Sequence, residues 1–262
     1  MTQRTVKQPR PDRVAPMSVQ VGPPTGGWDA IRPPRRRHAV PAWVLKVTLA
    51  VTGVIWALFV AVHLFGNLKV FQGPAAFDAY AAWLRVVLYP LLPHEGVLWA
   101  LRVVLVVALI LHVACAAAVW ARGRRARGRH RARIHGGRSW ATWSMPITGL
   151  IILAFVVVHV MDLTLGLGVA SASFRPAVDG QPQAYENLVA SFQRPVMALF
   201  YVATMILLAL HIGTGSFTTA SDLGAMGRRL RATVTVVGGL LAVAILLGNS
   251  AIPILVLVGV LS

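Results

Sequence analysis

The apolar residues of this chain fall in long runs, without the alternation of two or about 3.6 residues that marks half-buried strands and helices. Such runs cross about 30 Å of hydrocarbon when they rise roughly 1.5 Å per residue. Because backbone groups in lipid must be satisfied internally, each run predicts a helix. The pattern therefore predicts an all-α integral membrane bundle of five transmembrane helices, with cofactor sites in its core. The five spans are residues 42–66, 96–120, 141–165, 195–216 and 232–261.

Two further segments complete the predicted organisation. Residues 74–90, PAAFDAYAAWLRVVLYP, are amphipathic, flanked by prolines and contain tryptophan and tyrosine. We expect them to form an interfacial helix over the outer end of the bundle. Residues 1–41 are rich in proline and arginine and lack the apolar core of a signal peptide. They are expected to be a basic cytoplasmic extension ahead of a five-helix membrane domain at 42–261.

The net charge of +17 is distributed unevenly along the chain. Residues 1–41 and 121–138 hold eight Lys or Arg each and residues 217–231 hold three, whereas 67–95 and 166–194 hold two each. By the positive-inside rule, this asymmetry predicts a multi-pass protein of the cytoplasmic (inner) membrane, with its N-terminus inside and its C-terminus outside. It also explains the net charge without a nucleic-acid partner.

One histidine lies in each of the first four spans: His63, His112, His159 and His211. Topology puts His63 and His159 near the outer ends of their spans, and the other two nearer the inner ends. At about 1.5 Å per residue, the two levels are roughly 15–20 Å apart. Hydrogen bonds between helices are one explanation for imidazoles in hydrocarbon. The other is metal ligation, because two facing imidazoles supply the axial nitrogens of a haem iron. Two levels then predict two haems and a path for electrons.

Four stretches carry a family resemblance. They are HLFGNLKVFQGPAAFDAYAAWLR (63–85), LWALRVVLVVALILH (98–112), GLIILAFVVVHVMDL (149–163) and YENLVASFQRPVMALFYVATMILLALH (185–211). In this order they resemble the single-chain, five-helix cytochrome b558 subunit of succinate dehydrogenase and fumarate reductase, over about residues 42–225.

The resemblance implies a membrane subunit of succinate dehydrogenase that has no catalytic residue for succinate itself. A flavoprotein subunit and an iron–sulfur subunit would bind its cytoplasmic face, and electrons would pass through up to two haem b groups to a quinone, usually menaquinone. It also implies that His63 pairs with His159 and His112 with His211. The rivals are a cofactor-free structural anchor and the cytochrome b anchor of another dehydrogenase.

Cys115 is the only cysteine and lies one helical turn after His112. A free cysteine is often a small buried hydrophobe. Alternatively, its thiolate ligates a Rieske-type [2Fe–2S] cluster together with His112 and His211, as is thought for some actinobacterial relatives of the family. A Rieske centre uses two histidines and two cysteines, so a fourth ligand would have to be another residue type. Residues 211–224 also depart from the family pattern, since they lack a second histidine.

Two charged residues lie close to the predicted centres. Asp162 follows His159 by one turn, and it either caps the helix end, orients the histidine, ligates a cluster or accepts a proton near quinone. Arg102 lies inside the second span about ten residues from His112. Pairing with haem propionates would explain Arg102, and snorkelling to the outer interface is the alternative.

Quinone reduction consumes protons, so a quinone site needs a proton donor beside an apolar slot. His94 and Glu95 precede the second span at the outer side, and Glu95 resembles a carboxylate of the family's distal quinone site. At a helix start, a glutamate is also favoured by the helix dipole alone. A proximal site near the iron–sulfur subunit would instead draw on Trp43, Ser139, Trp140, Trp143 and Ser216.

Overall fold

The computed structural model describes residues 40–127, 137–178, 181–224 and 227–262. Residues 1–39 lie outside the described residues, and with them most of the predicted extension at 1–41.

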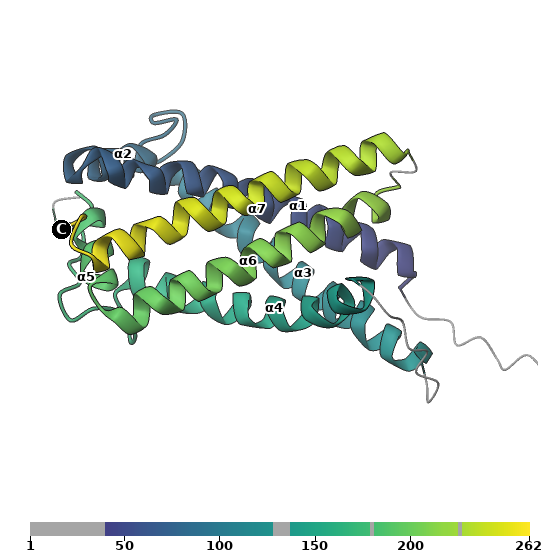
Figure 1. Cartoon of the computed structure of the whole chain (residues 1–262). Helices are drawn as coiled ribbons and strands as arrows, with labels where there is room; N and C mark the ends of the chain where they lie inside the picture. The colour runs from purple at the N-terminus through teal and green to yellow at the C-terminus, as the bar shows by residue number, and fades with distance from the viewer. Residues whose placement is uncertain (1–39, 128–136, 179–180, 225–226) are drawn as a thin grey trace, which may run out of the picture. The chain divides into compact units, whose positions relative to one another are not determined.

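Five long helices form a bundle (Figure 1). Each is long and apolar enough to cross a membrane, which confirms the predicted all-α, five-span architecture. The chain is thus a multi-pass membrane protein. The helices are α1 (Ala42–Asn67), α3 (Gly96–Arg127), α4 (Gly137–Val160), α6 (Pro195–Asp222) and α7 (Arg228–Leu257).

The helices extend past the predicted spans where basic residues follow the apolar runs. The last helical residue of α3 is Arg127 rather than residue 120, and α7 begins at Arg228 rather than 232. Hydropathy marks only the apolar part of a helix, whereas arginine is a good helix former and the backbone hydrogen bonds continue outside hydrocarbon. The helices are therefore longer than the predicted spans because they include polar ends.

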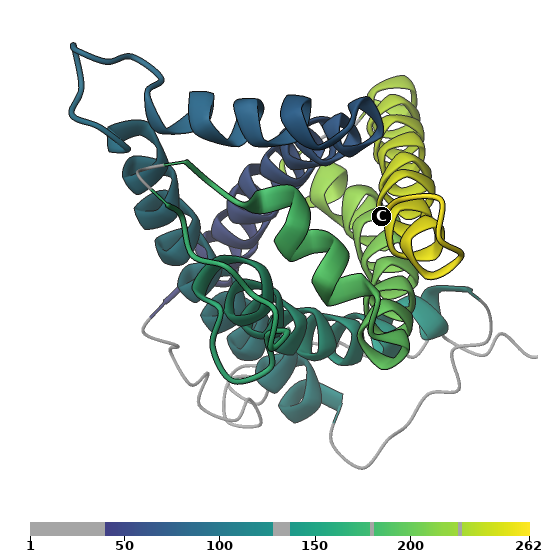
Figure 2. The same ribbon diagram turned by 90° about the vertical axis from the view of Figure 1, so that its left-hand side faces the viewer.

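Four short elements connect the spans: η1 (Leu68–Gln72), α2 (Pro74–Arg85), η2 (Met161–Leu165) and α5 (Ala184–Phe192). Figure 2 shows α2 and α5 lying across one end of the bundle. Between η1 and α2 the chain turns at Gly73, whose φ of 93° favours glycine. The predicted helix at 74–90 ends early, at Arg85, because turns take the chain from there into α3.

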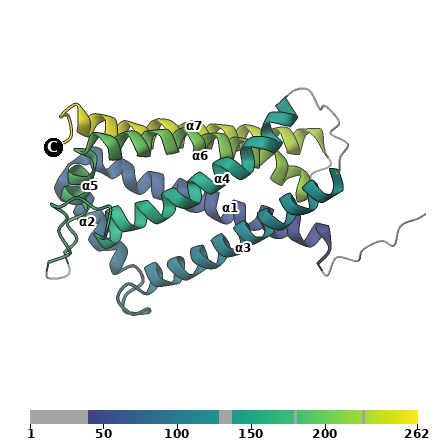
Figure 3. The same cartoon turned by 90° about the horizontal axis from the view of Figure 1, so that it is seen from below.

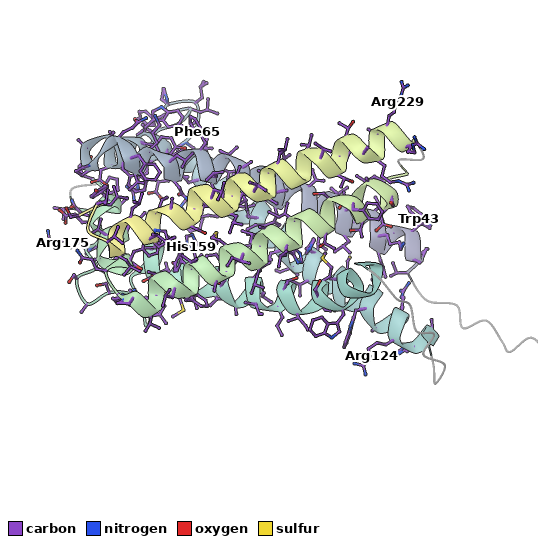
Figure 4. All side chains as sticks on the ribbon, in the orientation of Figure 1. Trp43, Phe65, Arg124, His159, Arg175 and Arg229 are labelled. Carbon is purple, nitrogen blue, oxygen red and sulfur yellow. The ribbon has the colours of Figure 1, made fainter. Side chains whose placement is uncertain are left out.

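The two ends of the bundle differ in chemistry. At one end α1 begins, α3 ends and α6 is joined to α7, and Trp43, Arg124 and Arg229 are labelled there in Figure 4. We call this the basic end. The opposite end carries α2, η2, α5 and the C-terminus, and Arg175 is labelled there. We call this the loop end.

Helix packing places α1 and α6 in the middle of the bundle. The main contacts are α6 with α7, α1 with α3 and α4 with α6, while α1 also contacts α6. Figures 2 and 3 show α3 and α7 on opposite sides. A small residue allows α7 to pack tightly on α6: a Cβ at Gly238 of α7 would overlap Ser216 Oγ of α6.

Candidate functional site

The four membrane histidines meet in two pairs. The ring centroids of His63 (α1) and His159 (α4) are 5.8 Å apart, with the planes at 84°. Those of His112 (α3) and His211 (α6) are 6.5 Å apart, at 58°. These are the pairs that the depth argument predicted. We call the first the loop-end pair and the second the basic-end pair, after the nearer end of the bundle; Figure 4 labels His159 in the half toward the loop end.

The ring spacing suits one metal ion between each pair. A metal ion bound in line between two ring nitrogens, about 2 Å from each, puts the ring centroids roughly 6 Å apart. The observed 5.8 and 6.5 Å lie on either side of that value. Two axial nitrogens are all that the protein supplies to a haem iron of this type. The centroid separation of each pair is therefore compatible with one metal ion between its two rings.

Threonine hydroxyls fix the rings of the basic-end pair. Thr52 Oγ1 lies 3.1 Å from His112 Nδ1, and Thr148 Oγ1 lies 3.0 Å from His211 Nδ1. Each hydroxyl already donates its hydrogen to a backbone carbonyl one turn earlier in its own helix. The hydroxyl oxygen is left to accept, so Nδ1 of each histidine carries the hydrogen. The lone pair of each imidazole is then on Nε2, where it is available to a metal ion.

A glycine follows each of these threonines and brings the backbone close to the imidazole. A Cβ at Gly53 would lie 3.3 Å from His112 Cε1, and a Cβ at Gly149 would lie 3.4 Å from His211 Cε1. Each ring therefore packs against the neighbouring helix where a side chain is missing. Threonine and glycine together define the position of each basic-end histidine.

The loop-end pair is held by aromatic rings. Phe59 stacks on His63 at 5.4 Å, and Phe155 stacks on His159 at 5.6 Å, each from one turn earlier in the same helix. Tyr201 of α6 places its hydroxyl oxygen 3.4 Å from His159 Nδ1. That hydroxyl donates to Asp162 Oδ2 at 3.1 Å, so its oxygen is left to accept from Nδ1–H of His159. Here too the geometry leaves the lone pair on Nε2.

Asp162 lies beneath Tyr201 and is 1% exposed. Arg194 Nη2 donates to its Oδ1 at 2.6 Å, and the Ser191 hydroxyl donates to its Oδ2. Arg194 is held in turn by the backbone oxygen of Val169 at 2.7 Å. Asp162 belongs to the π-helical turn η2, which directly follows α4. Of the roles considered for Asp162, an orienting one matches these contacts, but it reaches His159 only through Tyr201.

The sequence contains a signal for several of these contacts that the histidine spacing alone does not give. TGVIWALFVAVH (52–63) and TGLIILAFVVVH (148–159) are identical at seven of twelve positions. The shared positions include the threonine, the glycine, the phenylalanine and the histidine described above. Self-comparison of the chain would have found Thr52 and Thr148, whereas Tyr201, Ser191 and Arg194 have no counterpart in this repeat.

Cys115 is buried and free, as expected for a small apolar filler. Within the described residues, no three His, Cys, Asp or Glu side chains lie close enough together to hold one metal ion. His112, Cys115 and His211 thus do not form a site for a single metal ion, and ligation of a two-iron cluster by them stays a prediction.

Arg102 and Glu95 form part of a surface network. Arg102 Nη1 lies 3.7 Å from Glu95 Oε2, and its guanidinium stacks over Trp99 at 4.7 Å. Arg85 Nε donates to Glu95 Oε1 at 3.0 Å. Arg102 is 45% exposed, which matches the snorkelling alternative. The pairing of Arg102 with haem propionates stays a prediction.

The remaining predicted quinone residues lie apart from the histidine pairs or outside the described side chains. His94 is exposed in the turn before α3. Trp43 and Trp143 are largely exposed, as interfacial tryptophans are. Ser216 packs against Gly238 and donates to its own helix backbone at Ile212. The side chains of Ser139 and Trp140 lie outside the described part of the chain.

The fold and the site define a five-span membrane bundle with two histidine pairs stacked along its axis. Comparison with known proteins adds no closer assignment: no family model, no curated protein and no solved structure matches the chain.

Proposed function

We propose that this chain is the membrane-anchor and electron-transfer subunit of a succinate:quinone oxidoreductase. In this role, it receives electrons from an iron–sulfur subunit and passes them through two histidine-ligated centres to a quinone. The observation that carries the proposal is the presence of two neighbouring imidazole pairs at two levels of one bundle. The resemblance of four sequence stretches to the cytochrome b558 family supplies the identity of the complex.

In this proposal His63 and His159 hold one haem b, and His112 and His211 hold the other. Haem b, when bound between two histidines, carries one electron at a time on its iron. Thr52, Thr148 and Tyr201 keep Nδ1 protonated, so that Nε2 of three of the four rings is free to ligate.

The direction of electron flow follows from the two ends. The basic end carries the arginines of the loops that the positive-inside rule assigns to the cytoplasm. The iron–sulfur and flavoprotein subunits bind there in this proposal, so the basic-end pair receives electrons first and the loop-end pair second. The acceptor is a quinone, and the family resemblance favours menaquinone.

A reduced-minus-oxidised visible spectrum of the purified complex, combined with metal analysis, tests the proposal. Two b-type haems per membrane chain are the expected result. Iron with acid-labile sulfide in this chain, and no haem, would instead indicate a [2Fe–2S] centre in the same complex. Neither haem nor cluster would leave only a structural anchor, with quinone reduced directly by the iron–sulfur subunit.

Two substitutions test the role of the pairs in turnover. His112→Ala and His159→Ala each remove one axial nitrogen and are expected to abolish quinone reduction, while succinate oxidation by an artificial dye continues. Val113→Ala and Val160→Ala are matched controls, because each lies beside a tested histidine on an exposed face. Unchanged quinone reduction in both histidine variants would contradict every form of the electron path.

A further inference from the structure

We infer that Tyr201 and Asp162 are positioning residues for His159: they fix its Nδ1–H and thereby tune the loop-end centre independently of the basic-end centre. The presence of a metal centre at the loop end rests on the proposed function, whereas the hydrogen-bond chain itself does not. The chain runs from His159 Nδ1 through the Tyr201 hydroxyl to the carboxylate of Asp162, and from there to Arg194.

The direction of each hydrogen bond follows from what each group can donate. An ionised carboxylate only accepts, so Asp162 takes hydrogens from Tyr201, Ser191 and Arg194. The single hydroxyl hydrogen of Tyr201 is thereby used. The Tyr201 oxygen can therefore only accept from His159 Nδ1, so Nδ1 must carry the hydrogen of the ring. Tyr201 thus selects one tautomer of His159, and Asp162 selects the orientation of the Tyr201 hydroxyl.

Arg194 forms an ion pair with the buried carboxylate of Asp162. Its Nη2 lies 2.6 Å from Asp162 Oδ1, and the side chain of Asp162 is 0% exposed. Arg194 also donates to the backbone of Val169 and Ser191, which holds the guanidinium in place. A buried charge without its partner is strongly unfavourable, so the ion pair is a fixed part of the loop end.

The two histidine pairs differ in the group that accepts the hydrogen of the neighbouring hydroxyl. The hydroxyls of Thr52 and Thr148 donate to neutral backbone carbonyls. The hydroxyl of Tyr201 donates to a carboxylate, which polarises the phenol and makes its oxygen a stronger acceptor. A stronger hydrogen bond at Nδ1 makes the imidazole a more basic ligand. A more basic ligand stabilises the oxidised metal, so the chain is expected to lower the reduction potential of the loop-end centre alone.

Tyr201→Phe tests the inference with little change in packing. The ring of Tyr201 packs against Phe155 at 5.0 Å and Phe192 at 4.8 Å, contacts that phenylalanine keeps. In a potentiometric titration followed by visible absorbance, Tyr201→Phe is expected to raise the midpoint potential of one haem and leave the midpoint potential of the other haem unchanged. Asp162→Asn is expected to shift the same haem in the same direction. Thr204→Val is the control, since it removes a buried hydroxyl of α6 that donates only to Phe200.

A second readout does not depend on any cofactor. The ¹⁵N spectrum of the chain labelled at histidine, purified without cofactor in detergent, reports which ring nitrogen carries hydrogen. We expect a resonance with Nδ1 protonated for His159, assigned by its loss in His159→Ala and changed in Tyr201→Phe but not in Thr204→Val. This readout separates the two proposals: if the purified complex holds neither haem nor an iron–sulfur cluster in this chain and the ¹⁵N pattern is as expected, the electron-transfer role fails while the positioning of His159 stands.

Two results would overturn the inference while leaving the haem proposal intact. One is a protonated Nε2 on His159 in the unsubstituted chain. The other is a titration in which Tyr201→Phe moves neither midpoint potential, or moves both equally.

Discussion

At the scale of single residues, the hydroxyls beside the histidines decide what the imidazoles can do. An imidazole in hydrocarbon that bonded through both nitrogens would be a structural side chain only. Here each threonine accepts from Nδ1 and uses its own hydrogen on a carbonyl, which leaves Nε2 for a ligand. This arrangement of hydrogens is the chemical difference between a satisfied core histidine and an axial ligand.

Thr52→Val removes the oxygen that orients His112 while keeping the shape of the side chain. Loss of such a supporting hydrogen bond typically weakens metal binding by about 10- to 100-fold. We expect the purified variant to lose haem from one of its two sites, measured as haem per chain. Thr233→Val is the matched control, because that exposed threonine donates only to the backbone of Arg229. Full retention of haem by Thr52→Val would contradict the orienting role.

The residue scale also shows why sequence reasoning found the histidine pairs and missed their supports. The pairs followed from span boundaries and the rise of a helix, which depend on hydropathy alone. The ion pair of Asp162 with Arg194 depends on the π-helical turn η2 and on the residue where α6 begins. Hydropathy predicts neither of these features. The ion pairs of Glu95 with Arg85 and Arg102 were missed for a similar reason, since they depend on the turn after α2.

At the scale of elements, each of three helices carries one group at each level, about three turns apart. In α1 the two are Thr52 and His63, and in α4 they are Thr148 and His159. Tyr201 and His211 are the two in α6, where Tyr201 comes ten residues earlier. Since three turns are about 11 residues, both groups of a helix lie on one face and about 16 Å apart. A straight helix is therefore sufficient to build two centres.

The contact between α6 and α7 offers a test of helix packing that is independent of any cofactor. Gly238→Ala adds a Cβ that would lie 1.9 Å from Ser216 Oγ, so the helices or the serine must shift. Overpacking of this kind lowers the free energy of unfolding by about 1–3 kcal/mol. We expect a lower Tm for the purified chain in detergent. At the neighbouring Gly239, a Cβ meets nothing within 4 Å, so Gly239→Ala is expected to leave the Tm unchanged.

At the scale of the whole described bundle, the proposed orientation assigns each end to one side of the membrane. The native Cys115 is buried, so added cysteines can report the sidedness. Ser173→Cys at the loop end is expected to react with an impermeant thiol reagent in intact cells. Ser221→Cys at the basic end is expected to react only after the membrane is opened. Both serines are exposed, and the opposite labelling pattern would reverse the orientation.

The separation of the two histidine levels along the bundle has an electrical consequence. Moving one elementary charge across a whole membrane is worth about 2.3 kcal/mol per 100 mV. A step of about 16 Å covers roughly half of a 30 Å hydrocarbon layer, and thus about half of that energy. If the proposed electron transfer and orientation hold, with the basic end on the negative side, the resting potential would push an electron from the basic-end pair to the loop-end pair. The same voltage would oppose its return, so the depth of the four histidines would make electron transfer through the bundle depend on the membrane potential.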